Sequence, residues 1–183
     1  MTSVARLIHL NGPPGIGKST LAALYADDYP GTLNLDVDVL HRLIGGWRDP
    51  NNRTWDLAWP LVHSLASTHL RAGHDVVLPQ YHARLDEITT LETLAHHHGA
   101  SFQEVVLLDS RDSATARFDH RAQTTDDPWI QHHQRFVTRD DLVRMYDALV
   151  NLVPQLPDAQ VVSSTPDAIH ETYDLLSKTL GQP

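Results

Sequence analysis

Residues 12–20 read GPPGIGKST, and this stretch constrains the chain more than any other. It matches the phosphate-binding loop G-x-x-x-x-G-K-[ST], whose glycines let backbone N–H groups approach phosphate oxygens closely. We expect Lys18 to reach the β- and γ-phosphates of a nucleoside triphosphate and the Ser19 hydroxyl to bind Mg²⁺. The residues predicted to contact the triphosphate are Gly12, Pro13, Pro14, Gly15, Ile16, Gly17, Lys18, Ser19 and Thr20.

The residues on either side of the loop support this interpretation. Residues 4–10 form a short, largely apolar run that is typical of a buried strand, and residues 19–26 are good helix formers. A strand, a glycine-rich loop and a helix in this order are the arrangement that the motif needs, because the positive end of the helix then faces the anion. We therefore favour a nucleotide site over a chance glycine-rich turn.

Composition narrows the class of protein. A chain of 183 residues is expected to form one domain, residues 1–183, and it has no run of about 20 apolar residues that would span a membrane. The first predicted strand begins at residue 4, so we expect no signal peptide and a cytoplasmic protein. Zero cysteines exclude disulfides and thiolate zinc sites. The formal charge of −9 argues against nucleic acid as a partner, since such proteins normally carry a basic face.

The rest of the chain alternates short apolar runs with longer amphipathic ones, which is typical of α/β proteins. Further strands are predicted at residues 31–35, 75–79, 102–108 and 159–163. Helices are predicted at residues 39–44, from 56 or 60 to 72, 85–98, 113–121, 139–152 and 166–180, with a polar loop at 122–134. This order predicts a three-layer α/β/α fold with a five-stranded parallel sheet and helices on both faces. Ligands of such sheets bind beyond the carboxyl ends of the strands.

Two carboxylates, Asp36 and Asp38, follow the second predicted strand. Residues two apart at a strand end share a face, so both can point toward the triphosphate. One of them would hold Mg²⁺, and the other would accept the proton of an attacking hydroxyl. The alternative is structural: Asp38 would cap the helix at 39–44, or pair with Arg42 four residues on.

Arg117 and Arg121 lie four residues apart on one face of a predicted helix, directly before the polar loop. Charge that develops on a transferred phosphoryl group calls for cations, and arginine supplies planar, bidentate donors. The alternative is a solvated helix face with pairing to Asp112 or Asp119. Arg135, near the far end of the loop, is a weaker candidate.

The segment at about 45–60 holds three of the four tryptophans, among arginines, aspartates and asparagines. Such a composition suits a segment that closes over a substrate, with Trp47 and Arg48 as contacts. The alternative is a loop that its tryptophans anchor to the core. Gln80 and Tyr81 follow the third strand and are predicted to line the same pocket.

The third strand has no acid at its end, although many nucleoside triphosphatases carry one there to bind Mg²⁺ through water. It ends in Leu78, Pro79 and Gln80. Asp109 at the end of the fourth strand is a possible substitute, and Asp36 is the better one because it follows the helix of the phosphate loop.

Together these features resemble the small P-loop kinases, a group that includes the shikimate, gluconate and nucleoside monophosphate kinases. Within it the chain is most similar to chloramphenicol phosphotransferase and the tunicamycin-resistance proteins, which are often labelled only as AAA-type ATPases. Residues 37–40 (VDVL) resemble the segment of the chloramphenicol enzyme that carries its proposed base. Residues 77–79 (VLP) and 102–121 resemble the tunicamycin-resistance group.

The resemblance implies a role for each matching residue. Asp36 would help to hold Mg²⁺, and Asp38 would orient and deprotonate the acceptor hydroxyl. Arg121 would lie over the transferring phosphate in a lid at about 121–137, and Arg117 would pack near the adenine. The loop after the last strand, with Ser164 and Thr165, would border the adenine.

The expected activity is therefore transfer of the γ-phosphate of MgATP to a hydroxyl of a small molecule, such as an antibiotic or another natural product. A second interpretation keeps the fold and makes the acceptor a nucleotide or a nucleic-acid 5′-hydroxyl. A third is an ATP-binding resistance protein that sequesters a ligand without transferring phosphate. The oligomeric state does not follow from the sequence.

Overall fold

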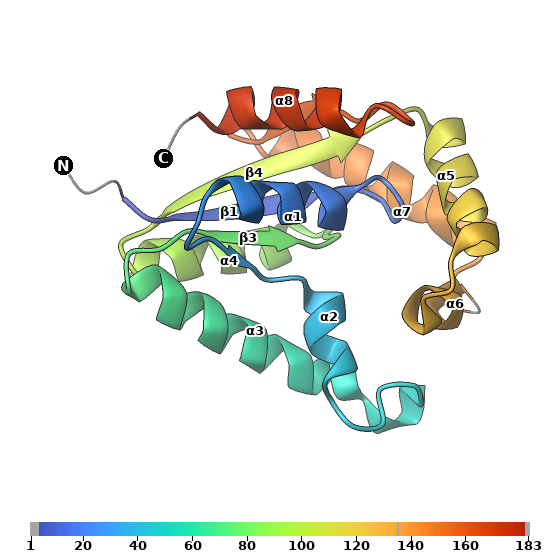
Figure 1. Cartoon of the computed structure of the whole chain (residues 1–183), viewed down its shortest axis with the longest axis horizontal. Coiled ribbons are helices and arrows are strands. Elements are labelled where there is room, and N and C mark those ends of the chain that lie inside the picture. Colours follow the sequence, from blue (N-terminus) through green and yellow to red (C-terminus); the bar gives the residue numbers. More distant parts are fainter. Residues whose placement is uncertain (1–3, 135, 182–183) are drawn as a thin grey trace.

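One parallel sheet forms the centre of the molecule (Figure 1). The computed structural model describes residues 4–134 and 136–181, without the side chains of residues 121–123 and 133–134. Five strands lie in the order β2-β3-β1-β4-β5, and each pairs in parallel with its neighbours. The strands are β1 (Arg6–Asn11), β2 (Leu33–Asn34), β3 (Val76–Pro79), β4 (Ser101–Leu108) and β5 (Gln160–Ser163).

Helices cover both faces of this sheet, which confirms the predicted three-layer α/β/α fold (Figure 1). α1 (Lys18–Asp28) and α8 (Ile169–Leu180) pack on one face, and α3 (Thr54–Arg71) and α4 (Leu85–His97) on the other. The remaining elements are α2 (Val37–Arg42), η1 (Pro50–Asn52), α5 (Arg111–Thr124), α6 (Pro128–Gln134), α7 (Arg139–Leu152) and η2 (Val153–Gln155). Of these, α5 and α6 lie beyond the end of the sheet at which β4 terminates.

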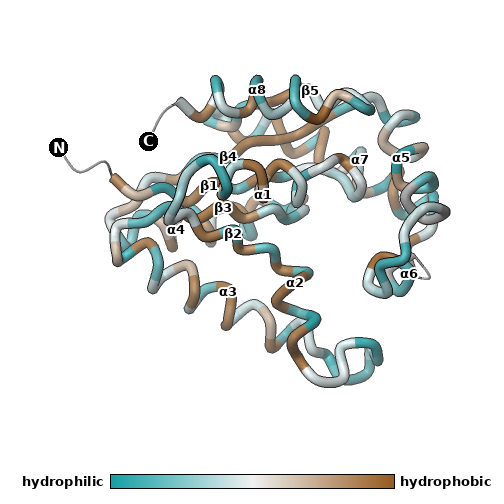
Figure 2. Tube along the Cα trace, viewed as in Figure 1, coloured by the Kyte–Doolittle hydropathy of each residue, from teal (hydrophilic) through white to brown (hydrophobic). Residues whose placement is uncertain are grey.

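The sheet separates two hydrophobic cores. Leu7 of β1 joins the core under α3 and α4, whereas Ile8 and Leu10 of the same strand join the core under α1 and α8. Successive side chains of a strand point to opposite faces, so a strand that is covered on both sides must be apolar on both. In Figure 2 the tube is coloured hydrophobic along the central strands, and hydrophilic residues lie on the outer turns of the helices.

The predicted polar loop at 122–134 is wrong, because it contains the end of α5 and all of α6. Asp127 starts α6: its Oδ1 accepts the N–H of Trp129 at 2.8 Å. Pro128 occupies the first position of the helix, where a missing N–H costs nothing. Trp129 is 5% exposed, and the burial of its ring stabilises a helix that the polar composition does not suggest.

The bounds of several elements differ from the prediction, and β2 and α3 are two examples. β2 is only Leu33–Asn34, shorter than the predicted 31–35, because it pairs with β3 at two positions only. α3 begins at Thr54 and runs through Pro60, so the proline does not mark its start. None of the helices in the described ranges has the length and apolar character that crossing a membrane requires.

Candidate nucleotide and acceptor site

The phosphate loop connects β1 to α1 at the carboxyl end of the sheet. Gly12 has φ +155°, and a Cβ there would lie 2.8 Å from the carbonyl oxygen of Leu107 and 2.9 Å from Cγ2 of Ile16. Gly17 is the N-cap of α1 in the left-handed region, with φ 106°. Both positions therefore require glycine, one for space and one for backbone conformation.

The first turn of α1 is built to receive an anion. It contains no acidic residue, and the N–H groups at a helix start lack partners within the helix. The Lys18 ammonium donates hydrogen bonds to the carbonyls of Gly12 (2.7 Å) and Pro13 (3.1 Å), which keeps its charge over the loop. The Ser19 hydroxyl adds a hard oxygen ligand of the kind that Mg²⁺ prefers. The loop thus fits a magnesium-bound triphosphate.

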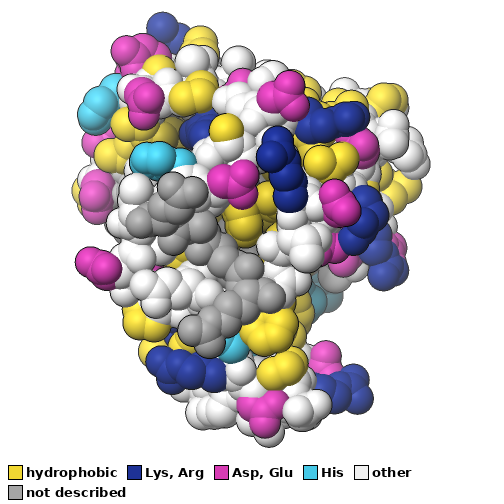
Figure 3. Space-filling view, turned by 90° about the vertical axis from the view of Figure 1, so that its right-hand side faces the viewer, with side chains coloured by type: hydrophobic (Ala, Val, Ile, Leu, Met, Phe, Trp, Pro, Cys, Tyr) yellow, Lys and Arg dark blue, Asp and Glu magenta, His cyan; other side chains and the backbone are white. Residues whose placement is uncertain are grey.

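A cavity of about 710 Å³ opens over the loop. Figure 3 looks onto this side of the molecule and shows hydrophobic side chains within a hollow, with charged side chains along part of its edge. The lining residues nearest the loop are Pro14, Gly15, Gly17, Lys18, Ser19, Thr20, Arg117, Phe118, Asp167 and Ile169. The others are Asp38, Trp55, Pro79, Gln80, Tyr81, Trp129, Ile130, Val137 and Met145. We call these two groups the donor end and the acceptor end.

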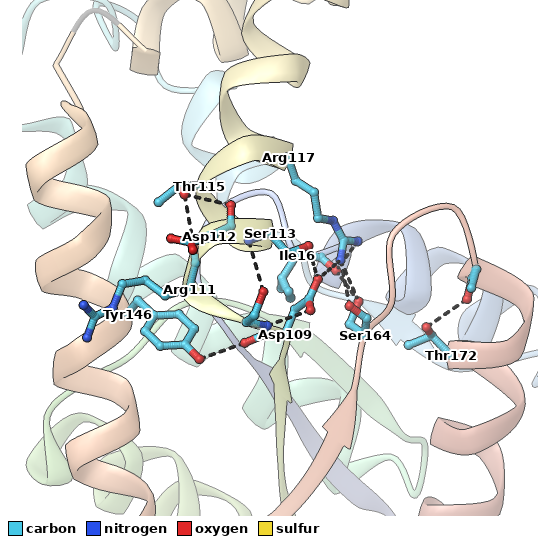
Figure 4. Close-up of polar contacts among 12 residues, drawn as sticks. Ile16, Asp109, Arg111, Asp112, Ser113, Thr115, Arg117, Tyr146, Ser164 and Thr172 are labelled. Carbon is cyan, nitrogen blue, oxygen red and sulfur yellow. Dashed lines mark hydrogen bonds and ion pairs between the residues drawn. The ribbon is translucent and has the colours of Figure 1, made fainter.

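Arg117 joins the phosphate loop to the segment after β5 (Figure 4). Its Nη2 donates to the carbonyl of Ile16 at 3.0 Å, and its Nη1 donates to the carbonyl of Ser164 at 2.8 Å. The Ser164 hydroxyl donates to the same Ile16 carbonyl at 2.8 Å. The side chain therefore lies in the donor end, and the alternative of a solvated helix face is wrong for Arg117.

Asp109 has a structural role at the end of β4. Its carboxylate accepts hydrogen bonds from the Ser110 N–H (2.6 Å) and the Ser113 hydroxyl, and it lies 3.6 Å from the Arg117 guanidinium (Figure 4). It is not among the residues that line the cavity. These contacts orient Arg117 and the start of α5, so Asp109 is a poor substitute for a magnesium ligand.

The two acids after β2 occupy different positions. Asp36 is the N-cap of α2: its Oδ1 accepts the N–H groups of Asp38 (2.9 Å) and Val39 (3.4 Å). The alternative in which Asp38 caps the helix is therefore wrong, because α2 begins at Val37, two residues earlier than predicted. The Asp38 side chain lines the cavity instead.

Aromatic rings gather at the acceptor end. His41 stacks on Trp55, with ring centroids 4.1 Å apart, and meets Trp129 of α6 edge-on at 5.1 Å. The ring centroids of Trp47 and Trp129 lie 5.0 Å apart. Burial, and then the charge of His132, lower the pKa of His41. Through Trp129 the cluster attaches α6 to α2 and α3.

Tyr81 connects the acceptor end to α7. Its hydroxyl donates to the carbonyl of Met145 at 2.9 Å, and burial, followed by the charge of Glu87, raises its pKa to about 12. The hydroxyl therefore stays protonated and its ring is held at the cavity wall. Gln80, its neighbour, also lines the cavity, as the sequence predicts.

Some predicted site residues are not brought to the cavity. Trp47 belongs to the aromatic cluster, and the Arg48 guanidinium lies 4.3 Å from the centre of the Trp47 ring. Neither lines the cavity, and the same is true of Asp36. Thr165 is exposed beside the buried Ser164. The predicted lid arginines, Arg121 and Arg135, lie outside the described side chains.

Several lining residues escape prediction from the sequence. Phe118, Trp129 and Met145 come from α5, α6 and α7, whose packing over the end of the sheet has no local signature. The one available signal was Asp-Pro-Trp at residues 127–129, a helix start that carries a large aromatic residue within a polar stretch.

Residues 7–139 match the AAA domain family. The chain belongs to this family. The chain also matches solved structures, at low sequence identity and over most of the length of this chain. No curated protein sequence gives a significant match.

The structural neighbours of this AAA domain include kinases. The tunicamycin resistance protein of Deinococcus radiodurans has a TM-score of 0.62 at 15% identity, over 98% of this chain and 97% of that chain. A gluconokinase from Sinorhizobium meliloti 1021 has a TM-score of 0.59 at 18% identity, over 97% and 96%. A chain of the Pnkp1/Rnl/Hen1 RNA repair complex has a TM-score of 0.68 at 16% identity, over 86% of this chain and 48% of that one. The AAA domain therefore has a P-loop kinase-like fold.

Proposed function

We propose that residues 1–183 form one kinase domain that moves the γ-phosphate of cytoplasmic MgATP to a hydroxyl of a small molecule. One observation carries this proposal: Asp38 lines the same cavity as Lys18 and Ser19 of the phosphate loop. A carboxylate that shares a cavity with a triphosphate site can accept the proton of an attacking hydroxyl.

The donor end would hold the nucleotide. The N–H groups of the loop and the Lys18 ammonium would bind the β- and γ-phosphates. A second cavity of about 440 Å³, lined by Gly15, Arg117, Pro166 and Asp167 among others, adjoins the loop and would take the base. Arg117 would then lie between base and phosphates, and Ser164 would fix its guanidinium. Ser164 and Thr165 would border the adenine from the segment after β5.

Ser19 and Asp36 are the residues that would hold Mg²⁺. When bound, the ion neutralises charge on the phosphates. Asp36 also caps α2 through Oδ1, so its position is fixed by the same helix that carries Asp38. The donor set of one hydroxyl and one carboxylate leaves the rest of the coordination to phosphate oxygens and water, as is usual for Mg²⁺.

The acceptor end suits a compound with an apolar or aromatic ring, such as an antibiotic or another natural product. Its wall consists of the Trp55, Tyr81 and Trp129 rings with aliphatic side chains from α6 and α7. Aromatic walls with a few polar groups bind such ligands by burying their rings. Gln80 would add a hydrogen bond, and Trp47 and Arg48 would support the wall from the segment 45–60.

The segment 121–137 would act as a lid, with Arg121 over the transferring phosphate. Closure excludes water, which otherwise competes with the acceptor for the phosphate. The contacts of Trp129 with Trp47 and His41 support this proposal, because they join α6 to the opposite wall of the cavity.

The test is to incubate the purified protein with MgATP or MgGTP and a panel of hydroxylated antibiotics, sugars, nucleosides and 5′-hydroxyl oligonucleotides. Products are weighed by mass spectrometry. We expect a small-molecule product heavier by one phosphate, whose formation falls at least about 100-fold in Asp38→Asn. Lys18→Ala should lose both transfer and ATP affinity, whereas Asp38→Asn should keep ATP affinity within a few-fold.

The other outcomes identify the alternatives. Phosphorylated oligonucleotide would indicate a nucleic-acid kinase. Ligand binding that requires ATP but gives no phosphorylated product would indicate sequestration. Full activity in Asp38→Asn would show that another group accepts the proton.

A further inference from the structure

Three polar side chains are buried beneath the phosphate loop, on the face of the sheet that α3 and α4 cover. His9 and Asn11 of β1 are fully buried, and Glu104 of the neighbouring strand β4 is 6% exposed. Polar groups in such a core are costly unless each is hydrogen-bonded. None of these three residues lines the donor end or the acceptor end of the cavity.

Asn11 joins two parts of the site that are distant in sequence. Its Oδ1 accepts the N–H groups of Gly12 at 2.9 Å and His82 at 3.0 Å. Its Nδ2 donates to the His82 carbonyl at 2.8 Å and to Glu104 Oε1 at 3.0 Å. One amide therefore links the first residue of the phosphate loop to both backbone groups of His82, which follows the acceptor-end residues Gln80 and Tyr81.

Glu104 and His9 fix the orientation of this amide. Glu104 Oε1 can only accept from Asn11, so Nδ2 must face Glu104 and Oδ1 must face the two N–H groups. Glu104 Oε2 lies 2.5 Å from His9 Nδ1, and His9 Nε2 lies 3.0 Å from the carbonyl of Gln80.

The Gln80 carbonyl is an acceptor, so His9 Nε2 must carry a proton. The 2.5 Å contact between His9 Nδ1 and Glu104 Oε2 closes the other end of the ring. The hydrogen bonds therefore run from Asn11 through Glu104 and His9 to the carbonyl of Gln80, which belongs to the acceptor end of the cavity.

We propose that Asn11, oriented by Glu104 and His9, is a positioning residue that couples nucleotide binding at the phosphate loop to the segment 80–82. The assignment of that segment to the acceptor rests on the proposed function. A shift of Gly12 would move the Asn11 amide with it, because each hydrogen bond broken here would leave a buried polar group unpaired. The amide would then move the His82 backbone, to which it is hydrogen-bonded, and with it the adjoining residues Gln80 and Tyr81.

The experiment uses MgADP as its probe and records the backbone amide of His82 by ¹H–¹⁵N NMR. His82 is suitable because it is not among the residues that line the cavity, so a bound nucleotide does not touch it directly. In the wild type we expect the His82 cross-peak to shift as MgADP is added. The dissociation constant fitted to this shift should equal the calorimetric Kd.

Two variants distinguish the loss of these hydrogen bonds from a general loss of folding. Asn11→Asp keeps the shape but replaces the Nδ2 donor by an acceptor that faces the His82 carbonyl and Glu104. We expect its His82 cross-peak not to respond to MgADP, and its His82 amide to exchange with solvent about 3- to 10-fold faster. Glu104→Gln is the matched control: it accepts from Asn11 with its oxygen and donates to His9 Nδ1 with its amide, so it should behave like the wild type.

Two results would overturn the proposal: a normal His82 response in folded Asn11→Asp, or loss of the response in Glu104→Gln. If Asn11→Asp does not fold, Asn11→Ser replaces it, because a hydroxyl can still accept from Gly12 but is too short to reach His82. Failure of the wild type to bind MgADP would contradict the proposed function instead, and the His82 exchange rates would still test the link. Once the phosphate acceptor is identified, Asn11→Asp should change the KM for the acceptor and kcat but leave the KM for ATP unchanged.

Discussion

Arg42 at the end of α2 and Asp127 at the start of α6 form an ion pair, with Nη1 3.1 Å from Oδ2. The same carboxylate accepts the N–H of Trp129, so it both begins α6 and ties this helix to α2. Because α6 supplies part of the acceptor end, the pair holds that wall of the cavity in place.

Replacing Arg42 by Gln should loosen α6 without unfolding the protein. Both side chains of the pair are about one third exposed, at 33% and 35%, so its loss should cost less than about 1 kcal/mol of global stability. We expect faster amide exchange in α6 and an unchanged urea midpoint. The control is Arg53→Gln, which removes the exposed Arg53–Asp56 pair and should leave α6 exchange unaltered. Equal exchange rates in Arg42→Gln and wild type would contradict the prediction.

Arg117→Lys should weaken nucleotide binding by about tenfold or more. A lysine carries the charge but cannot span the carbonyls of both Ile16 and Ser164, which the guanidinium does with two nitrogens. The measurement is the calorimetric Kd for MgATP. Arg111→Lys is the matched control on the same helix, because Arg111 pairs with Asp147 at the exposed surface. A similar loss of MgATP affinity in both variants would show that the two hydrogen bonds of Arg117 to Ile16 and Ser164 do not determine nucleotide binding.

Gly12→Ala should destabilise the phosphate loop. The new methyl group would lie 2.8 Å from the carbonyl of Leu107, and relief of such overpacking costs about 1–3 kcal/mol. We expect a lower free energy of unfolding in urea together with loss of MgATP binding. Gly45→Ala, where nothing lies within 4 Å of the added methyl, should change neither quantity. Wild-type binding by Gly12→Ala would show that the loop can move away from β4.

Stability should fall as the pH drops below about 6.5, and His82 should account for part of the loss. Burial, and then the charges of His9 and His63, lower the pKa of His82 from 6.5 to about 3. Its Nδ1 is buried without a hydrogen-bond partner among the described residues. Between these two pKa values the unfolded chain binds the extra proton, so the free energy of unfolding decreases with falling pH by up to about 1.4 kcal/mol per pH unit.

The prediction is checked by urea unfolding at pH 7, 6 and 5. His82→Phe keeps a ring beside Trp59 but cannot titrate, so its stability should decrease by about 2 kcal/mol less than that of the wild type over this range. The exposed His97 offers a control, since His97→Gln should reproduce the wild-type profile. Parallel profiles for His82→Phe and wild type would assign the acid sensitivity to other groups.

The sequence predicts the parts of this protein whose cause is local. The spacing of glycines and Lys18 identifies the phosphate loop, and alternation of short apolar and amphipathic runs identifies the sheet and most helices. The choice of Asp38 and Gln80 as site residues rested on their places after predicted strands, and both line the cavity. The exception is α6, where the burial of Trp129 outweighs a polar composition that indicates a loop.

Other features depend on where α2 begins and on which strands are neighbours. Asp36 rather than Asp38 became the cap because the helix starts at Val37, and a shift of one or two residues in a helix boundary exchanges their roles. Asn11 and Glu104 are 93 residues apart, and they meet because β4 lies beside β1 in the sheet.

The sequence by itself therefore determined the nucleotide loop, the α/β class and the family of this protein, because each rests on neighbouring residues or on a short period. Only the tertiary structure decided that Arg117 braces the loop, that four aromatic side chains join α6 to the opposite wall, and that a buried amide connects the two ends of the site. The physical reason is that these contacts depend on the order of strands and the packing of helices, which are set by the burial of the whole core.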